Sequence, residues 1–397
     1  MREGWDYKLL GDIGKVSMCK RIYKKQTSSS GDIPFYKIGT FGKEPDAFIS
    51  KDLYEEYRSE YSFPNKGDVL LSASGTIGRR VVYNGEPAYF QDSNIVWIAN
   101  DETEVLNEYL YAFYGFCDWS PSKGATISRL YNDDLRKTKI PIPPLPEQKQ
   151  IVAILDEVFE AIDQARANVE RNIQNAEELF QSKLNEIFSR RGEEWEKKTL
   201  EQIALEFGRG KSKHRPRNDE RLFGGDYPFI QTGDVRGATK YITEFSQTYN
   251  ETGLKQSKLW PQGTVCITIA ANIAESAILD FDGCFPDSII GIYVDPEKAH
   301  NSYAYYCLQY FKAELQAQGK GSAQDNINLG TFKERYFPFP NKITQKEVAK
   351  TLDTLLDNKN ALIDQYQHQL ENLEELKKSI LQKAFSGELT ANEHVAV

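Results

Sequence analysis

Positive charge is concentrated in two short stretches of the 397-residue sequence. Residues 13–31 and residues 207–217 each carry five lysines or arginines and no aspartate or glutamate. Such clusters supply the donors that bind phosphate oxygens, and they act locally even where the net charge is negative, here −9. The alternative for any run of charge is a solvated loop that binds nothing. The two stretches are therefore candidate phosphate-binding patches.

Polar and basic side chains at corresponding places in the two halves of the chain extend these patches. In a reader of double-stranded DNA, basic side chains contact phosphates, arginine suits guanine, and glutamine or asparagine suits adenine. Ordinary solvent-exposed surface is the alternative for each residue taken singly. The candidate DNA contacts are Lys20, Arg21, Lys24, Lys25, Thr76, Arg79, Arg80, Lys123 and Arg129 in the first half, and Arg209, Lys211, Lys213, His214, Arg215, Asn272, Lys320, Gln324 and Asn326 in the second.

Motifs of catalysis are absent from the sequence. There is no G-x-x-x-x-G-K-[ST] loop, no G-x-G-x-x-G after a predicted strand, no G-x-S-x-G elbow and no H-E-x-x-H pair. The Asn/Asp-Pro-Pro-aromatic tetrapeptide with which amino-methyltransferases hold a flipped base is also missing. Five cysteines without a C-x-x-C pair and four scattered histidines indicate neither a disulfide framework nor a metal site. We expect a non-catalytic protein with no cofactor of its own.

Length and charge distribution divide the chain further. A chain of 397 residues is long enough for several domains. Segments 147–188 and 343–386 together hold −6 of the net charge, so the remainder is near neutral and its basic patches stand apart from the acidic segments.

No signal peptide is visible and no apolar run approaches the roughly 18 residues of a membrane span, which predicts a cytoplasmic protein.

The second half of the chain repeats the first, with an offset that drifts from 190 to 197 residues. The order of the landmarks is kept, which indicates a duplicated half rather than chance similarity. The matching pairs are Trp5 and Trp195, "IPFYKIGT" (33–40) and "YPFIQTGD" (227–234), "GDVLLSASGTIG" (67–78) and "GTVCITIAANIA" (263–274), "QDSNIVWI" (91–98) and "PDSIIGIY" (286–293), "GATISRL" (124–130) and "GSAQDNI" (321–327), and the proline strips "KIPIPPLPEQKQIV" (139–152) and "YFPFPNKITQKEV" (336–348).

A long helix is predicted after each proline strip, because apolar residues recur there at three- and four-residue steps with no interior proline or glycine. Short runs rich in Val, Ile, Thr and Tyr predict strands elsewhere in each half. Each helix would extend about 60 Å, and the second can bury its apolar seam against the first only if the two run antiparallel. Two helices packed separately on their own domains are the alternative. The predicted seam consists of Ile151, Leu155, Ile162, Val169, Leu352, Leu355, Leu362, Tyr366 and Leu373.

These motifs, in this order and run twice, resemble the specificity (S) subunit of type I restriction-modification systems over essentially the whole chain. The resemblance rests on W-x-x-x-x-L-G-x-I, "GDVLLSASGTIG", D-S-N, "IPIPPLPEQKQIVAILD" and "GSAQDNINLGTF", which looks like the loop that precedes the proline strip in that family. The second half departs from the pattern, since "ITIAANIAES" lacks the glycines of "LSASGTIG" and "FPFPNKITQKEV" lacks the P-x-x-E-Q form.

The resemblance implies an α+β fold, in which two similar mixed α/β target-recognition domains are joined by an antiparallel pair of long coiled-coil helices with an internal pseudo-twofold. The expected boundaries are 1–145 for the first recognition domain, 146–189 for the first spacer helix, 190–342 for the second recognition domain, 343–386 for the second helix and 387–397 for a C-terminal tail.

The function implied by the resemblance is that of a DNA-specificity subunit. In that family each recognition domain reads half of a gapped bipartite DNA site, while the helices set the gap and dock two methyltransferase subunits. Those subunits bring S-adenosylmethionine and methylate adenine, and restriction subunits add ATP- and Mg²⁺-dependent translocation and cleavage. The long apolar seam predicts that the isolated chain self-associates.

Two other classes of function are compatible with the residues. A scaffold whose halves bind peptides or proteins would make the charged patches incidental, and it would show no salt-dependent DNA binding. A self-sufficient DNA-modifying enzyme would consume S-adenosylmethionine without any partner.

Overall fold

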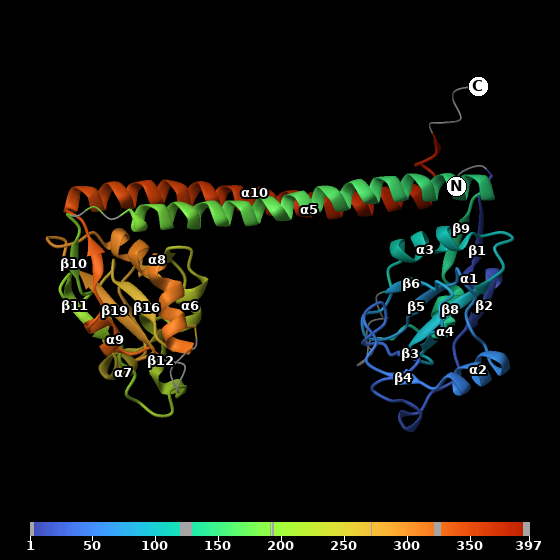
Figure 1. The fold of residues 1–397 in the computed structure, drawn as a ribbon, viewed down its shortest axis with the longest axis horizontal. Coiled ribbons are helices and arrows are strands. Elements are labelled where there is room, and N and C mark those ends of the chain that lie inside the picture. Colours follow the sequence, from blue (N-terminus) through green and yellow to red (C-terminus); the bar gives the residue numbers. More distant parts are fainter. Residues whose placement is uncertain are drawn as a thin grey trace. The chain divides into compact units, whose positions relative to one another are not determined.

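The computed structural model describes residues 4–119, 129–190, 192, 194–270, 272–320 and 327–391, without the side chains of 318–320. The chain divides into two compact units, Met1–Glu170 with Gln367–Val397, and Arg171–Tyr366. Each unit contains one copy of the repeat and part of both long helices, α5 (Leu145–Ser189) and α10 (Lys342–Ser386) (Figure 1).

The first unit is built on two small sheets and a two-stranded ribbon. One sheet has the strand order β2-β8-β5-β6, the other has the order β4-β3-β7, and β1 pairs with β9. Helix α3 lies against β5 and β6. The elements are β1 (Asp6–Leu9), α1 (Leu10–Ile13), β2 (Gly14–Ser17), η1 (Lys24–Gln26), β3 (Ile33–Tyr36), β4 (Phe48–Ile49), α2 (Lys51–Glu60), β5 (Val69–Ser72), β6 (Arg80–Val82), β7 (Tyr89–Phe90), β8 (Ile95–Asn100), α3 (Asn107–Phe116), α4 (Asn132–Lys137) and β9 (Lys139–Ile142).

The second unit follows the same plan. Its sheets have the orders β11-β19-β16-β17-β13 and β14-β12-β18-β15, β10 pairs with β20, and α8 lies against β16 and β17. The elements are β10 (Glu196–Lys198), β11 (Ala204–Arg209), η2 (Glu220–Leu222), β12 (Phe223–Phe229), α6 (Thr232–Gly237), β13 (Tyr241–Ile242), β14 (Gln247–Tyr249), α7 (Glu251–Gln256), β15 (Leu259–Trp260), β16 (Val265–Thr268), β17 (Ser276–Leu279), β18 (Gly283–Cys284), β19 (Ile289–Val294), α8 (Asn301–Lys320), α9 (Leu329–Lys333) and β20 (Phe337–Phe339).

Strand pairing repeats between the two units as well as element order. Strand β3 pairs antiparallel with β4 and parallel with β7, and β12 makes the same two kinds of pairing with β14 and β18. Strands β8 and β19 each pair antiparallel with two neighbours, β2 and β5 or β11 and β16. The mixed sheets, the duplication and the two long helices confirm the predicted α+β fold.

Within each unit the two long helices pack side by side and antiparallel. In the first unit Lys377 of α10 lies over the ring of Phe159, with 4.8 Å from Nζ to the ring centroid, and Arg166 pairs with Glu374. In the second unit Lys359 lies 5.1 Å from the ring centroid of Phe180. Residue numbers thus increase along α5 in the direction in which they decrease along α10, which confirms the predicted antiparallel orientation.

The seam between the helices differs from the prediction at one position. Ile151, Leu155, Ile162, Val169 and Leu352 are buried, and Leu355, Tyr366 and Leu373 are half-buried. Leu362 is 43% exposed, and its neighbour Ile363 is half-buried instead. The inward-facing residues of α10 include Leu356, Ile363 and Leu370, which recur every seven residues. Leu362 and Ile363 are adjacent and both fit three- and four-residue steps, and the prediction chose the one that lies outside the seam.

The proline strips are attached to their units by buried side chains. In the first unit the Tyr109 hydroxyl donates to the carbonyl of Pro141 at 2.9 Å, and Gln148 Nε2 donates to that of Pro143 at 2.9 Å. In the second unit Tyr303 and Gln345 donate in the same way to Pro338 and Pro340, at 2.7 and 2.8 Å. Proline has no N–H, but its buried carbonyl still needs a donor, and these side chains supply it.

Helix α10 is also tied to the second unit by a buried lysine. Lys240, which is 6% exposed, donates to Asp353 of α10 at 2.5 Å and to the Ser302 hydroxyl at 3.0 Å. The Tyr306 hydroxyl also donates to Asp353 at 2.5 Å. Charge compensation and three hydrogen bonds make this cluster the polar link between the β13 end of the sheet and the long helix.

Candidate nucleic-acid interface

The first basic stretch forms a loop that runs from β2 to β3. Arg21 Nε is 2.8 Å from Asp92 Oδ2, and Lys20 lies over the ring of Tyr61, 4.6 Å from its centroid. Lys24 and Lys25 lie in the short helix η1 and are exposed. Among the described residues the ammonium groups of Lys24 and Lys25 have no hydrogen-bond or ion-pair partner.

The second basic stretch forms the loop after β11, and its arginines hold the loop together. Arg209 Nε donates to the backbone carbonyl of Asp287 at 2.6 Å, and Arg217 pairs with the Asp287 carboxylate at 2.7 Å. Arg215 donates to the carbonyls of Ser212 and His214 at 2.7 and 2.8 Å. These three arginines therefore bind groups of the protein itself, in the loop and at Asp287.

Farther along this loop, Asp219 has hydrogen-bond partners in Arg221 and His214. Arg221 donates to it through Nε and Nη2, and His214 Nε2 lies 2.7 Å from its Oδ2. These bonds, that from Arg221 above all, hold the pKa of Asp219 well below its usual range. Lys211 and Lys213 are exposed, and in the described part of the chain their ammonium groups are unpaired.

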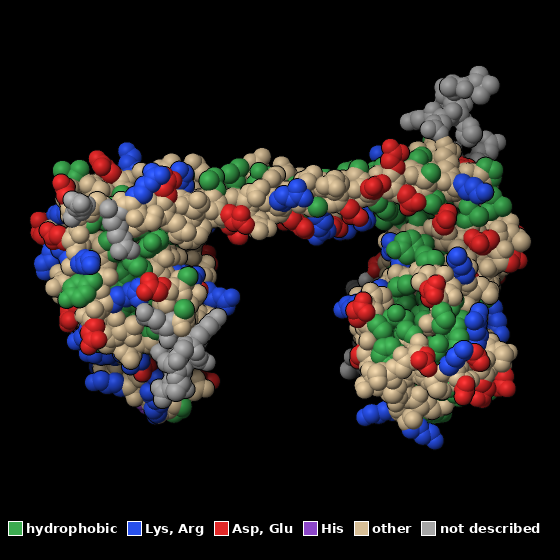
Figure 2. Space-filling view, viewed as in Figure 1, with side chains coloured by type: hydrophobic (Ala, Val, Ile, Leu, Met, Phe, Trp, Pro, Cys, Tyr) green, Lys and Arg blue, Asp and Glu red, His purple; other side chains and the backbone are tan. Residues whose placement is uncertain are grey.

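The two units share one arrangement of acid and arginine. Asp92 and Asp287, which the repeat aligns, each bind an arginine of the nearby basic stretch, Arg21 or Arg217. The carboxylate beside a paired arginine offsets part of the attraction that the arginine exerts on a phosphate, whereas an exposed unpaired lysine has no such offset. Figure 2 shows lysine and arginine side chains at the end of each unit that lies away from the long helices. The free lysines of these loops are thus the strongest candidates for phosphate contacts.

The loop after β5 has a counterpart of the same geometry after β16, although the second copy lacks its glycines. The Ser72 hydroxyl donates to the carbonyl of Thr76 at 2.6 Å and accepts from Arg79 N at 2.9 Å. Thr268 donates likewise to the carbonyl of Asn272 and accepts from Glu275 N at 3.0 Å. Ala274 has a φ of 62°, in the left-handed region that Gly78 occupies with 84°. Exposed Thr76 lies at the tip of the first loop, and Asn272 Oδ1 accepts from Arg236 in the second.

The remaining predicted contacts are distributed unevenly. Arg79 donates to the carbonyl of Phe41 at 2.8 Å, Arg129 to that of Ser93 at 2.9 Å, and the Arg80 guanidinium lies 4.5 Å from the ring centroid of Tyr111. These three arginines thus support the loops of the first unit. Lys123, Gln324 and Asn326 lie outside the described residues, as does the side chain of Lys320.

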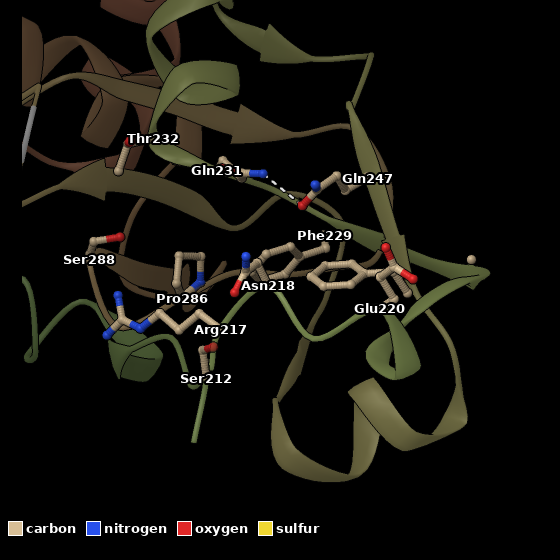
Figure 3. A pocket seen from close by; sticks show the side chains of 12 residues that line it. Ser212, Arg217, Asn218, Glu220, Phe229, Gln231, Thr232, Gln247, Pro286 and Ser288 are labelled. Carbon is tan, nitrogen blue, oxygen red and sulfur yellow. Dashed lines mark hydrogen bonds between the residues drawn. The ribbon is translucent and has the colours of Figure 1, made fainter. Parts of the chain in front are cut away.

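A pocket of about 680 Å³ in the second unit was missed by the sequence reasoning (Figure 3). Gln231, Gln247, Asn218 and Arg217 line it together with the ring of Phe229. Gln231 follows β12 and Gln247 opens β14, and Gln231 Nε2 donates to Gln247 Oε1 at 2.8 Å. The one available signal was the repeat, since "YPFIQTGD" places Gln231 where "IPFYKIGT" has Lys37.

Burial shapes the chemistry of the cysteine thiols. Burial raises the pKa of the Cys19 and Cys117 thiols to about 12 and that of Cys284 to about 11, so these cysteines are poor nucleophiles. No cluster of histidine, cysteine, aspartate or glutamate within the described ranges could hold a metal ion. None of the helices described combines the length and apolar character that crossing a membrane requires.

Comparison with known proteins adds the family. Residues 2–171 and 192–372 match the type I restriction modification DNA specificity domain. A Haemophilus influenzae protein named as a type I restriction enzyme specificity subunit is 67% identical over 153 residues, which are 38% of this chain and 40% of that protein. A structure of HsdS from Thermoanaerobacter tengcongensis superposes with a TM-score of 0.59 at 19% identity, over 98% of both chains. A chain from a structural study of type I R-M complex assembly and conformational transition superposes with a TM-score of 0.78 at 18% identity, over 98% of this chain and 99% of that one.

Proposed function

We propose that this chain, which belongs to the type I restriction modification DNA specificity family, reads one gapped DNA sequence with its two recognition domains, one half-site each. The observation that carries the proposal is the repeated loop arrangement, in which an aspartate binds an arginine while Lys24 and Lys211 are exposed and, within the described residues, unpaired. Phosphate contacts from these lysines fix the register of each unit, and polar side chains between them read base edges.

The long helices set the length of the unread gap. Each has 45 residues. Their interiors contain no glycine, and the one proline lies in the first turn of α5. A packed pair of such helices resists bending, so it is suited to holding two recognition domains at a defined separation.

Catalysis belongs to partner subunits. Two methyltransferase subunits dock on the helices and supply S-adenosylmethionine, and restriction subunits, which use ATP and Mg²⁺, join through them. Leu179, Leu362 and Leu376 are 60%, 43% and 46% exposed on α5 and α10, and they offer apolar surface for such docking. The chain itself is non-catalytic and works in the cytoplasm, where it meets DNA.

Methylome sequencing tests the function in the cell. Genomic DNA is sequenced from cells that carry this gene with its partner genes and from cells that lack only this gene. We expect the deletion to abolish adenine methylation at one gapped, two-part motif. An unchanged methylome in a strain with a competent methyltransferase would contradict the proposal and favour the scaffold. Consumption of S-adenosylmethionine by the purified chain alone would instead favour a self-sufficient enzyme.

A further inference from the structure

The pocket of the second unit contains an amide pair with a defined orientation. Gln231 and Gln247 come from two segments that β12 and β14 bring together by antiparallel pairing, with Phe229 opposite Gln247 in register. One N–H of Gln231 is used by Gln247 Oε1 at 2.8 Å, which fixes the plane of the Gln231 amide (Figure 3). The carbonyl oxygen and second N–H of Gln231 lie in that same plane.

The equivalent place in the first unit has different chemistry. There Lys37 follows β3, Asp46 precedes β4, and Lys37 Nζ is 2.8 Å from Asp46 Oδ1. The strands on which the two pairs stand have the same pairing in both units. Lys37 stands at the place of Gln231, and Asp46 stands one residue before Ala47, the counterpart of Gln247 in strand register, so the two units carry different side chains here on the same framework. This is where two domains of one plan can differ in what they recognise.

The surroundings of the amide pair fit a DNA base. Arg217 and Asn218 line the same pocket, and Arg217 is held there by Asp287 at 2.7 Å. Lys211 and Lys213, exposed and unpaired within the described residues, belong to the loop that carries Arg217. Cations that contact phosphates fix the orientation of a protein on the duplex, and polar side chains beside them are then available to base edges.

We infer that Gln231 is a specificity-determining residue of the second unit, that it reads an adenine in the second half-site, and that Gln247 is its positioning residue. An amide presents one acceptor and one donor side by side, which match the N6 amino group and N7 of adenine in the major groove. The hydrogen bond that Gln231 donates to Gln247 removes the rotational freedom of the amide before DNA binds. This inference rests on the proposed function.

Base preference at single positions is the decisive measurement. Methylomes are compared for cells that express, with the partner subunits, the wild type, Gln231→Leu, Gln247→Leu, Gln231→Lys or Gln262→Leu. Gln262 is an exposed glutamine of the same unit outside this pocket and serves as the control. The half-site read by the first unit reports in every variant that the protein is folded and assembled.

We expect Gln231→Leu to reduce the preference for adenine at one position of one half-site roughly ten- to a hundredfold, with the other positions unchanged. Gln247→Leu should give a smaller loss at that same position, and Gln231→Lys should move the preference there toward guanine. Gln262→Leu should leave the motif as it is.

Two results would overturn the inference, and they separate it from the proposed function. If the motif depends on the chain but Gln231→Leu keeps every base preference, or weakens methylation equally at all sequences, the inference alone fails. If deletion of the gene leaves every gapped motif in place, the proposed function fails and the inference fails with it.

Discussion

Gln148 and Gln345 make the same hydrogen bonds in the two units, 197 positions apart. Each donates to a proline carbonyl, Pro143 or Pro340, and each accepts the backbone N–H of a residue that precedes the unit's main helix, Leu106 or His300, at 2.9 Å. Both side chains are fully buried, at 0% and 1% exposure. One amide therefore links each long helix, its proline strip and its unit.

Removal of either glutamine amide should destabilise its unit. Gln345→Leu leaves one carbonyl and one N–H without these partners, and Gln148→Leu leaves two carbonyls and one N–H, because Gln148 also donates to Glu104. Either loss should lower the free energy of unfolding by about 2–4 kcal/mol. Urea unfolding followed by hydrogen exchange in each unit measures the change. Gln164→Leu, at an exposed position of α5 where Gln164 bonds only Asn168, should change stability by less than about 0.5 kcal/mol. Equal effects of the buried and exposed replacements would contradict this role.

Loss of Asp353 should leave the buried charge of Lys240 uncompensated. Asp353→Leu should lower the free energy of unfolding of the second unit by about 2–3 kcal/mol. The loss is smaller than for a fully buried pair, because Asp353 is partly exposed and solvent screens its pairing with Lys240. The double replacement Lys240→Met with Asp353→Leu should recover most of that loss, since no unpaired charge remains. A double-mutant cycle measures this coupling, and strictly additive losses would show that the two side chains act independently.

Lys211 and Lys213 should contribute to the salt dependence of DNA binding. The slope of log K against log salt is expected to become shallower by about 0.9 for each lysine, replaced by glutamine, that contacts a phosphate. Titration of the assembled methyltransferase complex with a duplex that contains the motif provides the slope. Lys183→Gln, which removes a cation of α5 that pairs with Glu186 at 2.7 Å, should leave it unchanged. If Lys183→Gln changed the slope as much as replacement of Lys211 or Lys213 does, phosphate contacts by the loop would be excluded as the cause.

The loop around Asp219 should lose order in acid. Folding lowers the pKa of the Asp219 carboxyl, so the ionised carboxylate stabilises the folded state above the pKa that it has in the unfolded chain, about 4. This stabilisation is lost as the pH falls toward the pKa of the folded state. Asp219→Asn should therefore reduce hydrogen-exchange protection in residues 211–222 at neutral pH, with a difference from wild type that narrows below about pH 4. Asp226→Asn, at an exposed acid of β12, is the control. A difference that persists unchanged in acid would contradict the assigned cause.

The helices should determine the gap between the half-sites. Insertion of seven residues after Glu170 in α5 and before Leu370 in α10 adds two turns, about 10 Å, to both helices. At about 3.4 Å per base pair, the gap should grow by roughly three base pairs while both half-sites stay the same. Methylome sequencing reads both quantities at once. Altered half-sites with an unchanged gap would contradict the assignment of roles.

The sequence predicts this molecule best where a pattern is long or repeated. The helix expected over 146–189 spans Leu145–Ser189, because apolar spacing over many turns leaves little ambiguity. The seam prediction was wrong at Leu362, because Leu362 and Ile363 both fit three- and four-residue steps and the apolar pattern alone does not choose between them. Which cations remain free could not be predicted, because Asp287 lies 70 positions from Arg217 and only the folded sheet brings them together.

Gln231, the candidate base-contacting residue, could not be predicted from the sequence for the same reason. Its partner Gln247 is 16 positions away on another strand, so no local pattern in the sequence connects the two. Comparison of the two halves could have singled it out, since a lysine stands at the matching position of the first half.

In the described residues, the loops after β5 and β16 are each closed by one hydroxyl, from Ser72 or Thr268, that bonds backbone groups of the same loop. Ala73 and Ala274 between the closing bonds belong to the hydrophobic cores, whereas Thr76 is exposed at the tip, so Thr76 can be replaced without disturbing the strands that hold it. A substitution at this exposed tip should therefore change what the first unit can contact while the closed loop and its strands keep their geometry.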